Sequence, residues 1–300
     1  MSPKLKPRYG MANKSVSRIA RAKINIDLVI TGQRADGYHL LDSLVVFADF
    51  GDQITVSPAE KLSLTIFGPF GGGLLGQSDN LVLRSAQLLR DRFDIRVGAQ
   101  IELIKNLPIS SGIGGGSADA AAALKALAEL WGLCDKIPEM GDLPLLLGAD
   151  VPVCMASETR RMSGIGEVLT PVSLKKNLYM LLVNPGVSVS TAAIFQARAK
   201  RQAPFSKPLD IPPEIDDLAQ LRRLLLARGN DLQREACLVE PVISEVLNHL
   251  CATEGCIYSA MSGSGATCFA IYETQEAARA AEGEISQGKQ SWWVQVTQVI

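Results

Sequence analysis

The sequence predicts a two-domain α+β protein, because strand-like and helix-like segments alternate along most of the chain. A chain of 300 residues with 47% hydrophobic side chains is long enough for two cores of about 150 residues each. Its last four expected elements follow the order strand, strand, helix, strand, which has the rhythm of a ferredoxin-like unit. We therefore expect a disordered lead over residues 1–18, an N-terminal domain over 19–163 that carries a phosphate loop, and a C-terminal domain over 164–300.

The first domain begins with an alternating segment. From Lys23 to Ile30 the side chains alternate between two faces, which predicts a half-buried strand. One face carries Ile24, Ile26, Leu28 and Ile30, and the other carries the polar Lys23, Asn25 and Asp27. The turn signal Asp36-Gly37 lies within Gly32 to His39, a segment too long for a tight hairpin and therefore expected to be a working loop. Further strands are expected at Leu44–Ala48, Gln53–Ser57, Leu62–Phe67 and Gln100–Ile104, and helices at Leu81–Phe93 with Asp79 as the cap, at Ala118–Trp131 and at Glu139–Leu147.

The second half continues the alternation, and we find no internal repeat in it. Its expected strands are Tyr179–Asn184, Cys256–Ala260, Thr267–Tyr272 and Trp292–Val299, and its expected helices are Ala192–Arg201, Asp217–Arg228, Pro241–Thr253 and Gln275–Gln287.

Composition excludes several classes of protein. Lys and Arg number 30 against 31 Asp and Glu, so no global charge favours nucleic acid or an anionic membrane as partner. No apolar run approaches the roughly 20 residues that span a bilayer. The six cysteines are scattered without a zinc or disulfide pattern, and only two histidines are present, so we expect reduced thiols, no transition-metal site and a cytoplasmic protein. The basic bias before Asp27 is compatible with an import signal, but without an apolar segment it is better explained as a disordered lead.

One loop points to chemistry. Residues Leu107 to Asp119 follow an expected strand and open an expected helix, and four glycines fall between Gly112 and Gly116. Glycines let the backbone approach a ligand, and free amides at a helix start favour a phosphate, so the placement indicates an anion cradle. The loop lacks the Gly-Lys-Ser/Thr of a Walker A motif, and Ser117 stands where a dinucleotide fingerprint needs glycine. The simpler alternative is a flexible turn.

Three segments together resemble the GHMP kinases. Pro108–Ala122 resembles the second motif of that family, Met261–Thr267 its glycine-rich third motif and Arg21–Leu28 its first. The resemblance implies a GHMP kinase fold, with a ribosomal protein S5 domain 2-like N-terminal domain and a ferredoxin-like C-terminal domain. It also implies ATP as the phosphoryl donor, with Mg²⁺.

Within the family, three further segments resemble the branch whose small-molecule substrate is a cytidine diphosphate-linked polyol. They are Ala22–Asn25, Gly32–His39 and Leu147–Pro152. The resemblance implies that Lys23 and Asp150 are catalytic, with the substrate hydroxyl between them and the γ-phosphate. The residue types suit phosphoryl transfer, since a cation neutralises the equatorial oxygens and a carboxylate accepts or orients the hydroxyl proton. Without the resemblance, a lone lysine on a strand and an aspartate on a loop would be interpreted as a surface salt bridge, because such ion pairs are common.

Other site residues are also implied by the resemblance. A stacking aromatic and a hydrogen-bonding imidazole suit a pyrimidine, which Tyr38 and His39 would bind. The remaining substrate contacts would come from Asn25, Asp150, Thr191 and Phe195. The nucleotide would contact Asn80, Lys105, Pro108, Ile109, Ser110, Ser111, Gly112, Ile113, Gly114, Gly115, Gly116, Ser117 and Ala118.

Departures from the family pattern leave some questions open. Ile109-Ser110-Ser111 replaces a more glycine-rich stretch, and Ala118-Asp119 stands where Ser-Asn or Ser-Ser is also common. Ser117 can offer magnesium a hydroxyl, but no carboxylate ligand is evident. The alternatives are another GHMP kinase acting on a small alcohol of the homoserine or mevalonate type, or a non-catalytic nucleotide-binding or RNA-binding module. The oligomeric state is unknown from sequence.

Overall fold

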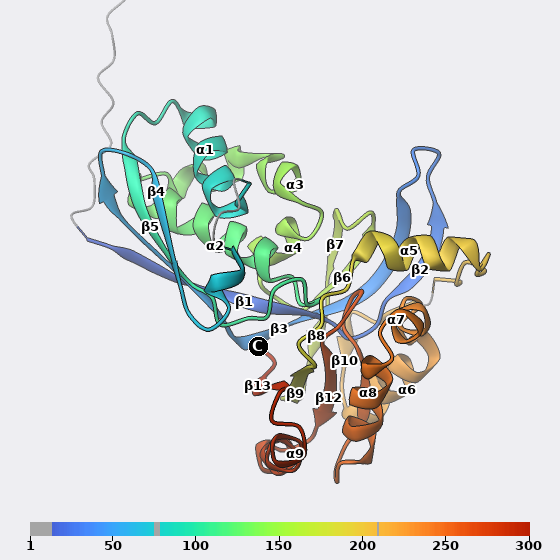
Figure 1. The fold of residues 1–300 in the computed structure, drawn as a ribbon. Helices are drawn as coiled ribbons and strands as arrows, with labels where there is room; N and C mark the ends of the chain where they lie inside the picture. Colours follow the sequence, from blue (N-terminus) through green and yellow to red (C-terminus); the bar gives the residue numbers. More distant parts are fainter. Residues whose placement is uncertain (1–13, 75–78, 209) are drawn as a thin grey trace, which may run out of the picture.

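The protein is described here by a computed structural model that covers residues 14–74, 79–208 and 210–300. Strands of the first half form a seven-stranded sheet, which Figure 1 shows beside a smaller sheet from the second half. In the larger sheet the order is β4-β5-β3-β6-β7, with β1 and β2 also paired to β3. These strands are β1 (Val16–Asn25), β2 (Val29–Gln33), β3 (His39–Ala59), β4 (Ser63–Phe67), β5 (Gly98–Ile104), β6 (Arg160–Gly164) and β7 (Val168–Pro171).

β3 is the central strand of this sheet. The expectation of two separate strands at Leu44–Ala48 and Gln53–Ser57 is wrong, because β3 covers both segments without interruption. The polar residues between them resemble a turn in the sequence, but the strand continues because Asp49 accepts a hydrogen bond from the amide of Gln298 at 3.0 Å. Gly51 is required at this point, since a Cβ there would lie 2.1 Å from the carbonyl oxygen of Ala20.

The first expected strand is also wrong in its bounds. Lys23–Ile30 is divided between β1, which begins earlier, and β2. Between them the amide of Leu28 donates to the carbonyl of Gly229 in the C-terminal domain at 2.9 Å. The chain therefore leaves the sheet at a point that alternation alone cannot show. β1 includes residues 16–18 of the expected lead, whose residues 1–13 lie outside the described part of the chain.

Helices α1 (Leu81–Phe93), α2 (Gly115–Leu130), α3 (Leu143–Leu147) and α4 (Val151–Ala156) cover one face of the large sheet (Figure 1). The alanine-rich α2 is the buried centre of this core. The side chain of Asn80, not that of Asp79, caps α1 by accepting the amide of Val82 at 2.8 Å. Short 3₁₀ turns lie at Gly71–Leu74 and Cys134–Met140.

The expected helix at Glu139–Leu147 needs correction, and it is followed by α4, a short helix that the sequence did not predict. Gly141 has a φ of +57° and separates the 3₁₀ turn from α3. α4 begins at Val151, because Pro152 occupies the first helical turn, where the missing N–H costs nothing.

The second half forms a four-stranded antiparallel sheet in the order β11-β12-β9-β13. Its strands are β9 (Tyr179–Asn184), β11 (Tyr258–Met261), β12 (Cys268–Tyr272) and β13 (Trp293–Gln298), and its main helices are α5 (Thr191–Lys200), α8 (Val242–Ala252) and α9 (Gln275–Gly288). The expected ferredoxin-like rhythm is confirmed. Additional elements are α6 (Leu218–Arg228), α7 (Gln233–Val239), for which we expected no helix, and the short pair β8 (Ser173–Leu174) and β10 (Glu214–Ile215).

A buried ion cluster joins the two halves. The guanidinium of Arg228 on α6 is fully buried and forms ion pairs with Asp27 and, at 3.2 Å, with Asp42. Arg161 on β6 binds the same Asp42 in a bidentate pair at 2.7 and 3.0 Å. Because a buried charge without its partner is costly, this cluster fixes how the halves meet.

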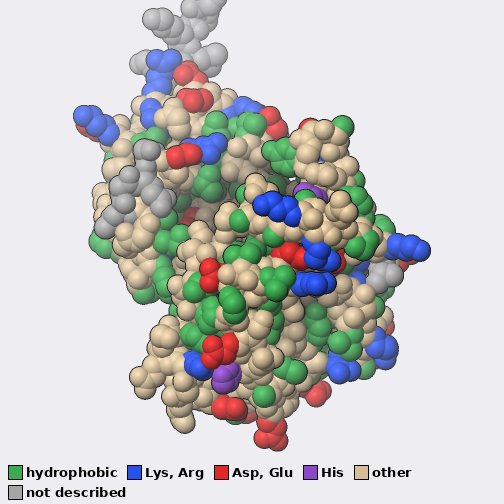
Figure 2. Space-filling view, turned by 45° about the vertical axis from the view of Figure 1, so that its right-hand side comes forward, with side chains coloured by type: hydrophobic (Ala, Val, Ile, Leu, Met, Phe, Trp, Pro, Cys, Tyr) green, Lys and Arg blue, Asp and Glu red, His purple; other side chains and the backbone are tan. Residues whose placement is uncertain are grey.

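The surface of the protein matches its balanced composition. On the face drawn in Figure 2, basic and acidic side chains are interspersed without an extended field of either sign. Among the residues that the structure describes, no helix is long and apolar enough to cross a membrane.

Candidate active site

A cavity of about 790 Å³ lies where the two halves meet, and most of the expected site residues line it. Its lining combines the loop before α2 with residues of β1 and of the C-terminal domain. The expected residues found there are Lys23, Asn25, Asn80, Lys105, Pro108, Ile109, Ser110, Ser111, Gly112, Gly114, Gly115, Gly116, Ser117, Asp150, Thr191 and Phe195. Asp79, Asp119, Ser190 and Ser264 also line it and were not among the expected site residues.

The amides of the loop point into an anion cradle. Gly114 caps α2 with a φ of +65°, and the first intrahelical bond runs from the amide of Ala118 to the carbonyl of Gly114 at 2.8 Å. The amides of the preceding first-turn residues therefore have no partner within the helix. They lie at the positive end of the helix dipole, so this end of the cavity suits a phosphate.

The third glycine-rich motif forms the floor of the cradle. The hydroxyl of Ser262 donates to the carbonyl of Gly112 at 3.0 Å and accepts the amide of Asn25 at the same distance. Gly112 has a φ of +77°, and a Cβ there would lie 2.4 Å from the carbonyl oxygen of Ser262. Glycine is therefore needed both for its conformation and for the close approach. The three motifs found in the sequence thus meet at one place.

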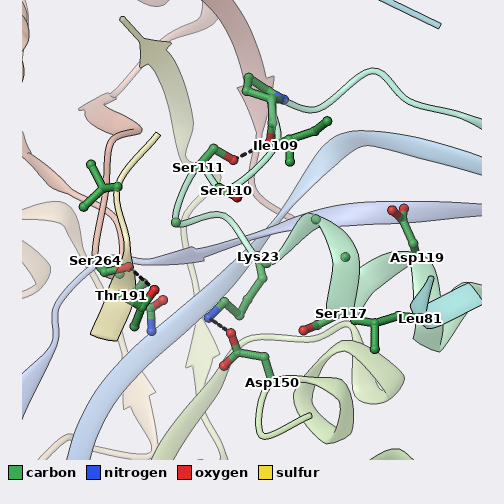
Figure 3. A pocket seen from close by; sticks show the side chains of 18 of the residues that line it. Lys23, Leu81, Ile109, Ser110, Ser111, Ser117, Asp119, Asp150, Thr191 and Ser264 are labelled. Carbon is green, nitrogen blue, oxygen red and sulfur yellow. Dashed lines mark hydrogen bonds and ion pairs between the residues drawn. The ribbon is translucent and has the colours of Figure 1, made fainter. Parts of the chain in front are cut away.

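Lys23 and Asp150 form an ion pair beside the cradle. The ammonium nitrogen of Lys23 lies 2.8 Å from Oδ2 of Asp150. The lysine side chain is 4% exposed, whereas that of Asp150 is 34% exposed and open to the cavity. Figure 3 shows the two facing each other, with the side chain of Ser117 directed toward the same space. The pair offers a cation and a proton acceptor next to the phosphate position.

A second buried ion cluster, formed by Lys105, Asp52 and Asp119, supports the phosphate loop before α2. Lys105 lies between Asp52, with which it forms an ion pair, and Asp119, whose Oδ2 is 2.7 Å from its nitrogen. Oδ1 of Asp52 accepts the amides of Asn106 and Leu107 at 2.6 and 2.8 Å, so the cluster sets the direction of the chain entering the loop. The sequence implied a nucleotide contact for Lys105 and gave no signal for its two carboxylate partners, which are distant along the chain.

The pKa values within this cluster have opposing causes. Burial raises the pKa of Asp119 to about 8, although the positive charge of Lys105 limits the rise. Burial works against the ammonium of Lys105, but the two carboxylates outweigh it and raise its pKa. Lys105 therefore stays charged. Oδ1 of Asp119 is buried and has no hydrogen-bond partner within the described part of the chain.

Aromatic residues mark the other end of the cavity. Phe195 on α5 lines the cavity and stacks on His39, with ring centroids 4.7 Å apart and an angle of 29° between the ring planes. Burial lowers the pKa of His39, and the charge of Arg198 lowers it further, so the imidazole is neutral at pH 7. Tyr38 lies on the adjoining loop and is 62% exposed.

Polar groups complete this end. The hydroxyls of Thr191 and Ser264 are hydrogen-bonded at 2.7 Å. The amide nitrogen of the Asn25 side chain donates to Ser43 at 2.7 Å, but its Oδ1 is buried without a partner among the described residues. An unpaired buried acceptor beside a cavity is suited to a ligand donor.

Four expected site residues do not line this cavity. Tyr38 is exposed on its loop, and His39 lies behind Phe195 in the stacked pair. The side chains of Ile113 and Ala118 are buried in the hydrophobic cores, so only their backbones face the loop. The carbonyl of Ile113 accepts the amide of Lys23 at 3.0 Å and thereby holds β1 against the loop.

Comparisons with known proteins show the family of this chain. The family model described as GHMP kinases N terminal domain matches residues 80–158, and the one described as GHMP kinases C terminal matches residues 213–289. A protein of Parvibaculum lavamentivorans named 4-diphosphocytidyl-2-C-methyl-D-erythritol kinase is 46% identical over 94% of this chain and 97% of its own length. A protein of the same name from Cereibacter sphaeroides is 50% identical over 92% and 96%.

Two solved structures are similar to this chain over nearly its whole length. A crystal structure of 4-(cytidine 5'-diphospho)-2C-methyl-D-erythritol kinase superposes with a TM-score of 0.75 at 29% identity, over 94% of this chain and 98% of the other. A homoserine kinase from Cytophaga hutchinsonii shares the fold with a TM-score of 0.67 at 19% identity, over 99% and 97%.

Proposed function

We propose, because this chain belongs to the GHMP kinase family, that it transfers the γ-phosphoryl group of ATP to the 2-hydroxyl of 4-diphosphocytidyl-2-C-methyl-D-erythritol, in the non-mevalonate route to isoprenoid precursors. The observation that carries the proposal is the Lys23–Asp150 pair, 2.8 Å apart, beside an amide cradle in a cavity of about 790 Å³. Relatives that cover nearly the whole chain carry the name of this activity. A cavity of this volume lies within the range of small-molecule sites.

The cradle and Lys23 perform the electrostatic part of the reaction. Phosphoryl transfer passes through a loose transition state with charge on the equatorial oxygens, so position and cations matter more than covalent chemistry. Free amides of the first turn of α2 bind the phosphates. Lys23 is almost fully buried and lies against the loop, so its charge acts on the transferred group with little screening by water.

Asp150 performs the proton transfer. Its carboxylate lines the cavity and lies 2.8 Å from the ammonium nitrogen of Lys23. As the substrate oxygen forms its bond to the γ-phosphorus, the bond between that phosphorus and the bridging oxygen breaks. Asp150 takes the hydroxyl proton, and ADP leaves with the electron pair of the broken bond.

Magnesium fits the oxygen atoms that line the cleft. This ion is usually held by one or two protein oxygens together with substrate phosphates. Ser117 offers a hydroxyl, and the buried Oδ1 of Asp119 lacks a partner among the described residues. These two residues would hold the ion, and the ion would neutralise charge on the phosphates.

The aromatic end would recognise the cytidine. Phe195 and Tyr38 offer faces for stacking on a pyrimidine, and the neutral His39 can hydrogen-bond its edge. Asn25 and Thr191 line the cavity between these rings and the Lys23–Asp150 pair, where the polyol would lie.

An ADP-release assay with three acceptors tests the proposal. We expect turnover with the diphosphocytidyl substrate and none with homoserine or mevalonate. Asp150→Asn should lower kcat by about 10²- to 10⁴-fold. Asp94→Asn is the control, because Asp94 is an exposed residue with a φ of +50° that asparagine also adopts.

Three other outcomes of this assay would contradict parts of the proposal. Equal turnover by the wild-type protein and Asp150→Asn would remove Asp150 from the mechanism. Preferred turnover of homoserine or mevalonate, with activity retained in Tyr38→Ala, would favour the other GHMP kinase activities. Nucleotide binding without ADP release for any acceptor would leave only a binding module.

A further inference from the structure

A second cavity, of about 340 Å³, lies against α2 and, among the residues that the structure describes, shares no lining residue with the active-site cleft. It is bounded by β1, α2 and the end of α4, which are neighbours in the fold (Figure 1). The lining residues are Ser17, Arg18, Ile19, Arg21, Ala118, Ala122, Lys125, Cys154 and Ser157.

Among the residues that the structure describes, three cations and no carboxylate line this cavity. Arg18 forms an ion pair with Glu129, which lies outside the lining. One nitrogen of Arg21 donates to the carbonyl of Ala48 at 3.4 Å, so its charge is not neutralised by that contact. Lys125 has neither a hydrogen bond nor an ion pair with any described residue.

The surroundings of Lys125 make its charge costly. Burial lowers the pKa of Lys125, and the positive charge of Arg18 lowers it further. The negative charge of Glu158 acts in the opposite direction, but Glu158 is already paired with Arg160 at 2.6 Å. Burial raises the pKa of the Cys154 thiol, so this group is neutral and adds no negative charge. The positive charge of the cavity therefore exceeds the negative charge around it.

We propose that this cavity is an anion-binding site, separate from the ATP site, that takes a small phosphorylated anion of diphosphate size. Arg21 and Lys125 offer positive charge without a carboxylate partner in the described part of the chain, and Arg18 adds N–H donors while paired with Glu129. Charge-assisted hydrogen bonds from guanidinium groups are a usual way in which proteins hold phosphates. Ser157, at the left-handed end of α4 with a φ of +53°, adds a hydroxyl donor. The small volume of the cavity and the balanced charge of the chain favour a small molecule over a nucleic acid.

The position of this site connects it with the catalytic elements. β1 carries Lys23 toward the cleft, α2 begins at the phosphate cradle, and Asp150 directly precedes α4. An anion that joins Arg21, Lys125 and Ser157 therefore links these three elements outside the active-site cleft. Because it binds the folded chain alone, it raises the unfolding temperature.

Isothermal titration calorimetry with sodium diphosphate tests the proposal. The protein is first saturated with a non-hydrolysable ATP analogue, which occupies the cradle. We expect one diphosphate per chain, weaker binding of orthophosphate and the weakest binding of sulfate. Lys125→Gln should weaken diphosphate binding by about tenfold, the loss of one charge-assisted hydrogen bond. Lys125→Arg, which keeps the charge, should stay within about threefold. Lys61→Gln removes an exposed lysine that lines neither cavity and should change nothing.

Three results would overturn the proposal. These are no diphosphate binding once the ATP analogue is bound, equal affinity in Lys125→Gln and the wild-type protein, and equal affinity for all three anions. Thermal unfolding of each variant without ligand verifies that Lys125→Gln is folded. The titration needs no turnover, so its outcome is independent of the kinase assay.

Discussion

The two ends of the active-site cleft are built in different ways. The phosphate end consists of backbone amides, held by buried residues such as Lys105 and Asp52, both under 5% exposed. The aromatic end consists of side chains from separate elements, and one of them, Tyr38, is 62% exposed. Backbone amides bind any phosphate, whereas side chains distinguish one acceptor from another. The difference teaches that chemistry and specificity are carried by separate parts of this cleft, and substitutions at each end should separate them.

Removing the charge of Lys105 should have the largest effect on stability, because its buried ion pairs support the phosphate end of the cleft. Lys105→Met leaves two buried carboxylates without their cation, so we expect the free energy of unfolding to fall by about 3–5 kcal/mol. Urea denaturation measures this. The control Lys175→Met removes an exposed pair with Glu214 and should cost less than about 1 kcal/mol. Similar losses in the two variants would show that the cluster does not hold the loop.

Substituting the cradle glycine comes next. Gly112→Ala adds a Cβ that would lie 2.4 Å from the carbonyl oxygen of Ser262, at a φ of +77°. We expect a loss of at least about 2 kcal/mol in unfolding free energy, together with a raised KM for ATP. Gly283→Ala is the matched control, since Gly283 lies in α9 with nothing near its Cβ position, and it should stabilise the protein by about 0.5–1 kcal/mol. An unchanged KM for ATP would separate this glycine from nucleotide binding.

Removing an aromatic ring should change binding of the acceptor but not of ATP, because the ring lies only at the acceptor end of the cleft. For Phe195→Ala we expect KM for the diphosphocytidyl substrate to rise about tenfold, within the 1–3 kcal/mol measured for base stacking, while KM for ATP stays the same. Phe205→Ala is the control, because this exposed ring lies outside the cavity. Steady-state kinetics, with the concentration of each substrate varied in turn, measures both KM values. A rise in both would contradict the assignment of the two ends of the cleft to different substrates.

The smallest expected effect is that of pH on His39. Because its pKa is lowered, mainly by burial, its imidazole stays neutral as the pH falls from 8 through 6.5, the ordinary histidine value, and becomes charged only in more acidic solution. KM for the acceptor should therefore be flat over that range and rise by about threefold below it, the loss of one neutral hydrogen bond. A pH profile of KM for wild type and His39→Gln measures this. An equal rise in the glutamine variant would assign the titration to another group.

The phosphate end was also the part that the sequence could predict. Residues Gly112 to Ser117 are contiguous, so their composition and their place between a strand and a helix sufficed. The expected bounds of β9 were confirmed because a buried strand between turn signals has only one interpretation. The Asp52–Lys105–Asp119 cluster could not be predicted, since its members are 53 and 14 residues apart and each resembles an ordinary surface charge. Nor could the stacking of His39 on Phe195, which depends on how the two domains meet.

The hydrogen bonds of Ser262 and Thr267 to the loop have a consequence for synthesis of the protein. Thr267 donates its amide to the carbonyl of Ser111 at 3.0 Å, and Ser262 supports Gly112. A ribosome translating this chain has therefore made almost all of it before the loop acquires its floor. Premature termination anywhere upstream yields a fragment whose nucleotide pocket is unfinished, so a truncated product should be unable to sequester ATP in the cell.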